Sequence, residues 1–268
     1  MNTQYEFFVR LGIFFSVLSV ISVWELLWPR RKLTQDKLVR WYSNLGLVAI
    51  SALALRLVFP ISAVGFAYLG QKNGWGLFNY TQISFGFEMV VSVIFLDLII
   101  YFQHAMFHFV PVLWRLHKVH HADLDFDVST GNRFHPLEIL LSMGIKFLAI
   151  AFLGASAASV LIFEILLNAT AMFNHGNIYL PLNFDRILRK ILVTPDMHRI
   201  HHSILIEEAN SNFGFNISVW DRLFGTYRGQ PKDGQTQMKI GINQFREKKF
   251  LNLHWLLVQP FISESKIP

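Results

Sequence analysis

The sequence predicts an all-helical protein that crosses a membrane several times. Hydrophobic residues make up 53% of the 268 residues and charged residues only 16%, and the mean hydropathy is +0.37. A soluble domain of this length would have too little interior to bury so many apolar side chains. Four apolar stretches are also long enough to enter or cross a bilayer core, and polar residues gather between and after them. The net charge of +6 is spread along the flanks of these stretches, so it does not indicate nucleic-acid binding.

The first two apolar stretches predict two membrane spans, with the N-terminus outside the cytoplasm. Residues 7–28 are long enough to cross the bilayer, and they lack the basic start, short apolar run and small-residue cleavage site of a signal peptide. The basic residues 30–32 follow at once, which places this loop in the cytoplasm and the N-terminus outside. Residues 45–69 then return outward as a second span.

The third stretch, residues 83–103, should cross inward after an outer turn at residues 71–82, which is rich in Gly and Asn. It carries two acidic residues, Glu88 and Asp97. A carboxylate inside a membrane needs a partner, so we expect both side chains to face protein.

The fourth stretch, residues 137–173, is too long for one span and short for two. Small residues at 154–159 (GASAAS) suit a tight bend with closely packed arms. We predict a membrane hairpin that enters and leaves on the cytoplasmic side, with Lys146 and Glu164 facing each other across it.

The rest of the chain is polar and basic, with twelve Lys or Arg in residues 176–268, which indicates a cytoplasmic location. Residues 194–196 (Thr-Pro-Asp) are a good helix start, with a capping hydroxyl, Pro at the first helical position and an acid in the first turn. We expect three parts: N-terminal transmembrane helices in residues 1–82, a catalytic domain in residues 83–228 and a C-terminal cytoplasmic tail in residues 229–268.

Ten of the eleven histidines fall in clusters or beside the apolar stretches. Two motifs have the spacing HxxHH and one has HxxxH, so each places imidazoles on one face of a helix. Two single histidines stand in FHPLE and FNHGN, and only His254 stands apart. The ten are His104, His108, His117, His120, His121, His135, His175, His198, His201 and His202.

These histidines predict a dimetal site held in a cytoplasmic helical cap. Neutral imidazole binds iron, copper, nickel and zinc, and ten imidazoles suit two neighbouring metals better than one. The alternative, that histidines cap helices and form ordinary buried hydrogen bonds, suffices for His254 but not for three clusters. The absence of cysteine excludes disulfides, thiolate zinc sites and cysteine-ligated iron–sulfur clusters.

The motif combination resembles the fatty acid hydroxylase / sterol desaturase superfamily of integral-membrane di-iron enzymes. The resemblance rests on the three histidine motifs and on NRFHPLE, FNHGN, TPDMHRIHHS, NSNFG and WDRLFGTY. It covers about residues 90–228, roughly half of the chain. It implies hydroxylation of a C–H bond in a sterol, fatty acyl chain or related lipid, with desaturation or ether cleavage as alternatives in the same superfamily.

The resemblance also implies the composition of the site. The cofactors would be two Fe, with Zn in purified material as an alternative, together with O2. All ten histidines would be metal ligands, and the eight in the three motifs would be catalytic. Four residues are candidates for orienting the ligand rings: Asp97, Tyr101, Asn174 and Asp196. For Asp97 a polar side chain satisfied inside the bundle is an equal alternative.

No haem, flavin or ferredoxin motif occurs, so electrons must come from a separate electron-transfer protein. The other expected partner is a lipid substrate in the membrane, which we expect to be a bacterial inner membrane. Two alternatives of other classes are weaker. A bis-histidine haem electron carrier would leave most imidazoles unexplained, and a metal transporter would have ligands near the bilayer midplane. A zinc protease is weaker still, because no HExxH motif occurs.

Overall fold

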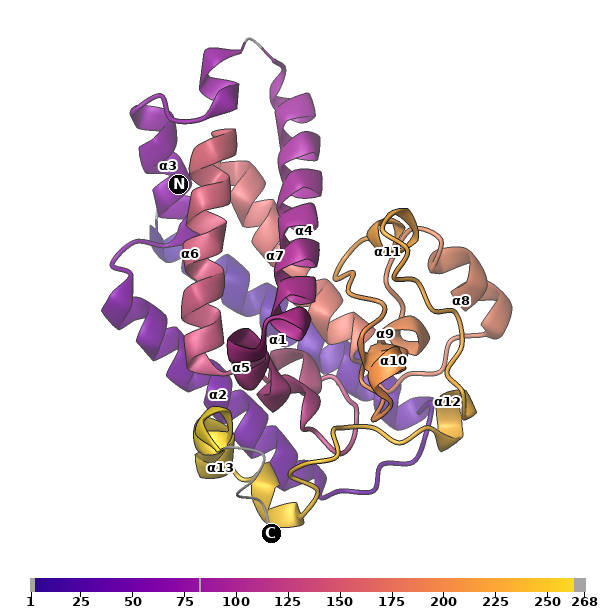
Figure 1. The fold of residues 1–268 in the computed structure, drawn as a ribbon. Coiled ribbons are helices and arrows are strands. Elements are labelled where there is room, and N and C mark those ends of the chain that lie inside the picture. The colour runs from indigo at the N-terminus through magenta and orange to yellow at the C-terminus, as the bar shows by residue number, and fades with distance from the viewer. Residues whose placement is uncertain (1–2, 82, 263–268) are drawn as a thin grey trace.

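The computed structural model describes residues 3–81 and 83–262, and these residues form helices joined by turns and loops (Figure 1). Within this part of the chain the only β-type pairing is three isolated bridges. The longer helices are α1 (Thr3–Leu27), α2 (Lys37–Val58), α3 (Ala63–Lys72), α4 (Phe85–Phe109), α5 (Pro111–His121), α6 (Pro136–Leu153) and α7 (Ala157–Asn174). Shorter helices follow: α8 (Leu182–Leu188), α9 (Pro195–His201), α10 (Ile206–Ala209), α11 (Val219–Leu223), α12 (Gly234–Gln237) and α13 (Leu253–Val258). Four 3-10 turns complete the set: η1 (Leu77–Tyr80), η2 (Thr130–Asn132), η3 (Lys248–Leu251) and η4 (Gln259–Phe261).

Five segments of the described chain are long and apolar enough to cross a membrane, which confirms the predicted membrane helix bundle. They are Glu6–Leu27, Lys37–Tyr80, Phe85–Phe109, Pro136–Leu153 and Ala157–Asn174. Helices α4, α6 and α7 stand side by side, with α3 against the hairpin (Figure 1). The shorter helices α8 to α11 lie to one side of this bundle and α13 lies below it (Figure 1).

The second predicted span, residues 45–69, lies within the segment Lys37–Tyr80, but the structure divides it into two helices, α2 and α3. The structure starts α2 eight residues earlier, where the Asp36 side chain accepts from the backbone N–H of Leu38, and breaks the helix at Pro60. Proline has no N–H to donate and forces the preceding residue out of the helical region. Phe59 is accordingly extended, and Ser62 caps the new helix α3.

The predicted helical hairpin is confirmed as α6 and α7, while the membrane side on which it enters and leaves stays a prediction. Gly154 ends α6 at a φ of +74°, a left-handed conformation that glycine adopts without a Cβ penalty, and Ser156 caps α7. The predicted pair across the hairpin also forms, with 2.5 Å between Lys146 Nζ and Glu164 Oε1. Arg10 of α1 bonds to the same carboxylate, so α1 is fixed against the hairpin.

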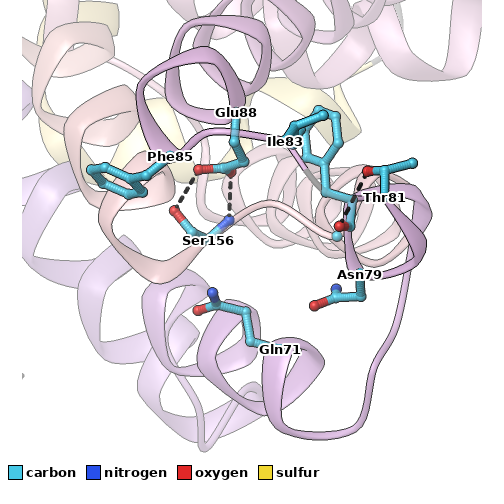
Figure 2. A pocket seen from close by; sticks show the side chains of 9 residues that line it. Gln71, Asn79, Thr81, Ile83, Phe85, Glu88 and Ser156 are labelled. Carbon is cyan, nitrogen blue, oxygen red and sulfur yellow. Dashed lines mark hydrogen bonds between the residues drawn. The ribbon is translucent and has the colours of Figure 1, made fainter.

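The buried carboxylate of Glu88 stabilises the hairpin bend from the neighbouring helix α4 (Figure 2). It accepts hydrogen bonds from the backbone N–H and the hydroxyl of Ser156, both at 2.9 Å, and from the Ser159 hydroxyl at 2.8 Å. A cavity of about 170 Å³ opens beside this carboxylate, with Gln71 and Asn79 in its wall. The intramembrane acid expected to need a partner therefore has one, at the end of the bundle away from the histidines.

The described part of the predicted tail, residues 229–262, packs on the rest of the fold. Leu256 of α13 is fully buried with Leu47 of α2 and Val119 of α5. Arg115 donates to the carbonyl of Pro260 at 2.8 Å. This segment therefore packs against α2 and α5, while the domain boundaries at 83 and 228 stay a prediction.

Candidate metal centre

Nine histidine side chains converge at one end of the bundle in two groups, and within each group the candidate ligand atoms lie within 4.8 Å of one another. The five-histidine group contains His104, His108, His117, His121 and His201. The four-histidine group contains His120, His175, His198 and His202.

Helical spacing explains how two identical motifs serve both groups. In α5 the residues at i and i+4, His117 and His121, join the five-histidine group, while His120 at i+3 faces the other. In α9 and its C-cap the assignment is reversed, because His201 at i+3 joins the five-histidine group. Each pair of adjacent histidines therefore spans the two groups, since neighbours on a helix point about 100° apart.

The remaining candidate ligands come from the membrane helices. The last two turns of α4 supply His104 and His108, and the C-cap of α7 supplies His175. The hairpin thus returns His175 to the metal side, as predicted. The predicted helix start at Thr194 is also confirmed, because its hydroxyl accepts from the backbone N–H of Met197.

Burial favours the neutral form of six of these imidazoles. Eight of the nine side chains are buried and His108 is half-buried. Burial lowers the pKa of His175 to about 3. It also lowers the pKa well below the usual value in His120, His121, His198, His201 and His202, and the neighbouring histidines add to the effect. A neutral ring has one nitrogen lone pair available for a metal.

In the four-histidine group the ring tautomers leave lone pairs facing each other. His175 donates from Nδ1 to the carbonyl of Ala171 at 2.7 Å, and His120 donates from Nδ1 to the carbonyl of Arg133 at 3.2 Å. Their Nε2 atoms, 3.1 Å apart, therefore both carry lone pairs. Two ligands about 2.1 Å from one ion would lie about 3.0–3.4 Å from each other. The repulsion is removed if a cation binds between them, so the residues fit a metal.

The five-histidine group has the same arrangement. His104 donates from Nδ1 to the carbonyl of Phe213 at 2.8 Å, and His201 donates to that of Ser211 at 2.7 Å. The Nε2 atoms of these two rings are buried without a hydrogen-bond partner among the described residues. The Nε2 of His117 is buried in the same state.

Two side chains orient ligand rings in the five-histidine group, and the sequence analysis missed both roles. Glu138, in the first turn of α6, lies 2.7 Å from Nδ1 of His117. The amide oxygen of Asn210 lies 3.2 Å from Nδ1 of His108. A carboxylate on the far nitrogen of a ligand fixes its tautomer and raises its basicity. The only available signal for Glu138 was its place in the NRFHPLE segment.

His135, predicted to be a tenth ligand, lies outside both groups. It is the N-cap of α6, and its Nδ1 accepts from the backbone N–H of Leu137 at 3.2 Å. Its Nε2 donates to the carbonyl of Leu257 at 3.2 Å. Both ring nitrogens are therefore used by backbone groups, and the structure brings nine of the ten predicted ligands together.

The four residues predicted to orient the rings bond to other parts of the chain instead of to the histidine rings. Asp97 accepts from the backbone N–H groups of Asn216 and Ile217 and from Trp220 Nε1, at 2.8 to 3.3 Å, so the alternative of an acid satisfied inside the bundle holds. The other three have these partners in the described chain: Tyr101 with Thr226, Asn174 with the Phe215 carbonyl, and Asp196 with Arg30 and Arg199. Three of the four thus hold the segment at 213–226, which supplies the acceptor for His104.

A buried ionic network holds the loop after the α5 histidines. The guanidinium of Arg40, on α2, bonds to Asp123 at 2.7 and 2.9 Å and to Asp127 at 2.5 Å, with all three side chains fully buried. Burial would raise the pKa of Asp123, but Arg40 and Arg133 hold it well below its usual range. Arg133 also donates to the carbonyl of Val119 at 2.8 Å. Arg133, whose carbonyl orients His120, is therefore held by the charge of Asp123 and by the Val119 carbonyl.

Comparison with known proteins agrees with this site. Residues 89–226, just over half of the chain, match the family model for fatty acid hydroxylase. The ornithine lipid hydroxylase OlsE of Rhizobium tropici is 27% identical over 95% of this chain and 76% of its own length. Human alkylglycerol monooxygenase is 27% identical over 56% of this chain, and the Delta(7)-sterol 5(6)-desaturase of Eremothecium gossypii is 26% identical over 68%.

The chain spans only 32% and 49% of the last two relatives' own lengths. No solved structure matches. The family match covers α4 to α11, which contain all nine clustered histidines. The named relatives are all lipid-modifying oxidoreductases, and this multi-pass membrane protein belongs to the fatty acid hydroxylase family of such enzymes.

Proposed function

We propose that this protein is a di-iron, O2-dependent oxygenase that hydroxylates a C–H bond of a membrane lipid. The observation that carries the proposal is the pair of histidine groups, which together offer nine imidazoles, eight of them buried and one half-buried. Imidazole ligands suit iron, and two adjacent groups that share α5 and α9 suit a dinuclear site. The near full-length likeness to an ornithine lipid hydroxylase supports hydroxylation as the first candidate.

In this proposal the two histidine groups would hold two irons, and these would supply the activation of O2 that attack on a C–H bond requires. The overall reaction converts R–H, O2, two electrons and two protons into R–OH and H2O, and the electrons come from a separate electron-transfer protein. The chain's own part is to hold the ligands and exclude water. Phe213 and Phe215 pack on His104, with ring centroids at 5.6 and 5.4 Å, so apolar rings shield the groups from solvent.

Desaturation and ether cleavage are the second candidates, because two relatives are named as a sterol desaturase and an alkylglycerol monooxygenase. Desaturation would remove two hydrogens where hydroxylation adds one oxygen. A bis-histidine haem carrier fits less well. Ring nitrogens 3.1–3.2 Å apart leave no room for a porphyrin between His175 and its neighbours.

The decisive experiment compares lipids and metals in cells that express the wild-type chain or a His120→Ala variant. We expect wild-type cells to accumulate a lipid 16 mass units heavier than its precursor, as one added oxygen requires. The purified chain should hold close to two metals, with zinc replacing iron in mismetallated material. A ratio near one would remove the dinuclear proposal, and a loss of two mass units would identify a desaturase.

The location of the site is also a proposal. The basic loop at residues 30–32 and the basic C-terminal third support a cytoplasmic metal side, and we propose a bacterial inner membrane. A reporter fused at residue 73 should then be non-cytoplasmic and one at residue 268 cytoplasmic. Both reporters on one side would overturn this orientation.

A further inference from the structure

Helices α8 and α11 expose a set of large apolar side chains beside the membrane bundle. Ile187 is 67% exposed and Leu223 is 66% exposed, although both belong to the part of the chain expected to form an aqueous cap. We call this set the α8–α11 face. It consists of Leu182, Phe184, Ile187, Ile191, Val219, Leu223 and Phe224.

The two helices form one unit. The backbone N–H of Ser218 donates to the carbonyl of Ile191 at 2.9 Å, and its hydroxyl donates to the carbonyl of Arg189 at 2.7 Å. Leu192 and Ile217 also form an isolated bridge. The turn after α8 is thus tied to the start of α11, so their exposed side chains move together.

The contacts of α4 fix the depth of this unit. Asp97 lies at the centre of α4, which runs from residue 85 to 109, so it is about 18 Å of helix before the metal-side end. Its carboxylate binds Trp220 Nε1 at 2.8 Å and the backbone of Asn216 and Ile217. Helix α11 therefore lies level with the middle of a membrane-crossing helix, with α8 beside it (Figure 1).

The exposed charges on the unit are all positive. Arg186, Lys190 and Arg222 are exposed. The two acids are buried and have partners inside the protein: Asp185 pairs with Arg189, and Asp221 accepts from the backbone N–H groups of Phe213 and Gly214. All charge that the unit presents to its surroundings is positive.

We propose that the α8–α11 face is inserted into the metal-side leaflet of the membrane. Acyl chains would cover its apolar side chains, and anionic lipid headgroups would bind Arg186 and Lys190, whose long side chains can reach the interface. A protein–water interface would instead leave seven large apolar side chains in water. The proposal depends on α4 crossing the membrane and does not depend on the chemistry at the metals.

The insertion brings lipid close to the histidines. Phe224 of the face stacks on Tyr101 at 5.2 Å between ring centroids, Tyr101 contacts Phe213 at 6.3 Å, and Phe213 contacts His104 at 5.6 Å. Two aromatic rings therefore separate the lipid-covered face from a metal ligand. The leaflet supplies lipid substrate beside the site without a passage through water.

The test uses the natural absence of cysteine. Ile187→Cys and Leu223→Cys are made in the full chain, labelled with a fluorophore and reconstituted at low density in vesicles that contain spin-labelled lipids. Val90→Cys, on the exposed surface of α4, reports a lipid contact, and Asp233→Cys, exposed on the C-terminal segment, reports water. We expect labels at 187 and 223 to be quenched at least half as strongly as the label at 90.

Quenching at 187 and 223 no stronger than at 233 would overturn the proposal. Shielding of both labels from a water-soluble quencher without lipid quenching would overturn it too, in favour of a protein partner or a second copy.

A second experiment tests the headgroup contact by comparing vesicles that contain about 30% phosphatidylglycerol, an anionic lipid, with neutral vesicles. Quenching at 187 should rise with anionic lipid, and this rise should disappear in an R186Q/K190Q background; a rise that persists would remove the headgroup contact.

Discussion

The two histidine groups share α5 and α9 but are oriented in different ways. In the five-histidine group, side chains hold two rings: Glu138 binds His117 and Asn210 binds His108. In the four-histidine group the ring acceptors are backbone carbonyls, those of Arg133 and Ala171. The other two rings of that group, His198 and His202, have no partner for Nδ1 in the described chain.

In the proposed dimetal site this difference would tune the two groups separately. A buried carboxylate raises the basicity of one ligand in the five-histidine group, and no acid contacts a ring of the four-histidine group in the described residues. A six-coordinate ion would also keep one open position with five imidazoles and two with four. We therefore expect a metal in the four-histidine group to have more open coordination positions for O2 or another exogenous ligand.

The largest effects should come from substituting two adjacent histidines, one in each group. His201→Ala removes a ligand from the five-histidine group and His202→Ala removes one from the four-histidine group. Each variant should lose one metal of two and lower activity more than about 100-fold, because losing a ligand exceeds the effect of losing an outer partner. Metal analysis and lipid mass spectrometry measure both effects.

His254→Ala is the matched control for these variants, because this exposed histidine lies in neither group. It should keep both metals and full activity. Loss of both metals in each ligand variant would show that the two groups bind metal as one unit.

The next largest effect should come from the ionic network behind the four-histidine group. Arg40→Met leaves Asp123 and Asp127 buried without their partner, which typically costs about 3–5 kcal/mol. The loop that carries the acceptor for His120 should loosen, so the unfolding midpoint should fall and the four-histidine group should lose metal first. Arg56→Met, an exposed change on the same helix, is the control. Equal destabilisation by both variants would remove the network from this role.

Glu138 tests the five-histidine group alone. Glu138→Ala removes the ring acceptor and should weaken metal binding there about 10- to 100-fold. Glu138→Gln keeps an acceptor oxygen but removes the charge, so it should fall between Ala and wild type. Competition with a chelator, read separately for the first and second metal, measures the effect. If the carboxylate affects both metals equally, the groups are not tuned separately.

Local spacing in the sequence was enough to predict eight of the nine clustered histidines, because i, i+3 and i+4 positions lie close together on a helix whatever the tertiary structure. His175 stands alone in the sequence, and its inclusion depended on the predicted hairpin. The hairpin was also predictable, since its length and small residues are local features. The partners of Asp97 were not, because they lie 119 to 123 positions away along the chain. The break in residues 45–69 had a visible signal in Pro60, which the apolar run of the span obscured.

The smallest expected effect belongs to His135, the predicted ligand that the structure leaves out. Pro136 occupies the first helical position of α6, which makes the preceding residue the N-cap, and the ring caps its own helix. His135→Ala should therefore cost about 1 kcal/mol of stability and leave two metals bound. His135→Asn restores a capping oxygen and should recover most of that stability without a metal-binding imidazole. Loss of a metal in both variants would return His135 to the ligand set, whereas a full metal complement in His135→Asn would establish that nine imidazoles are sufficient.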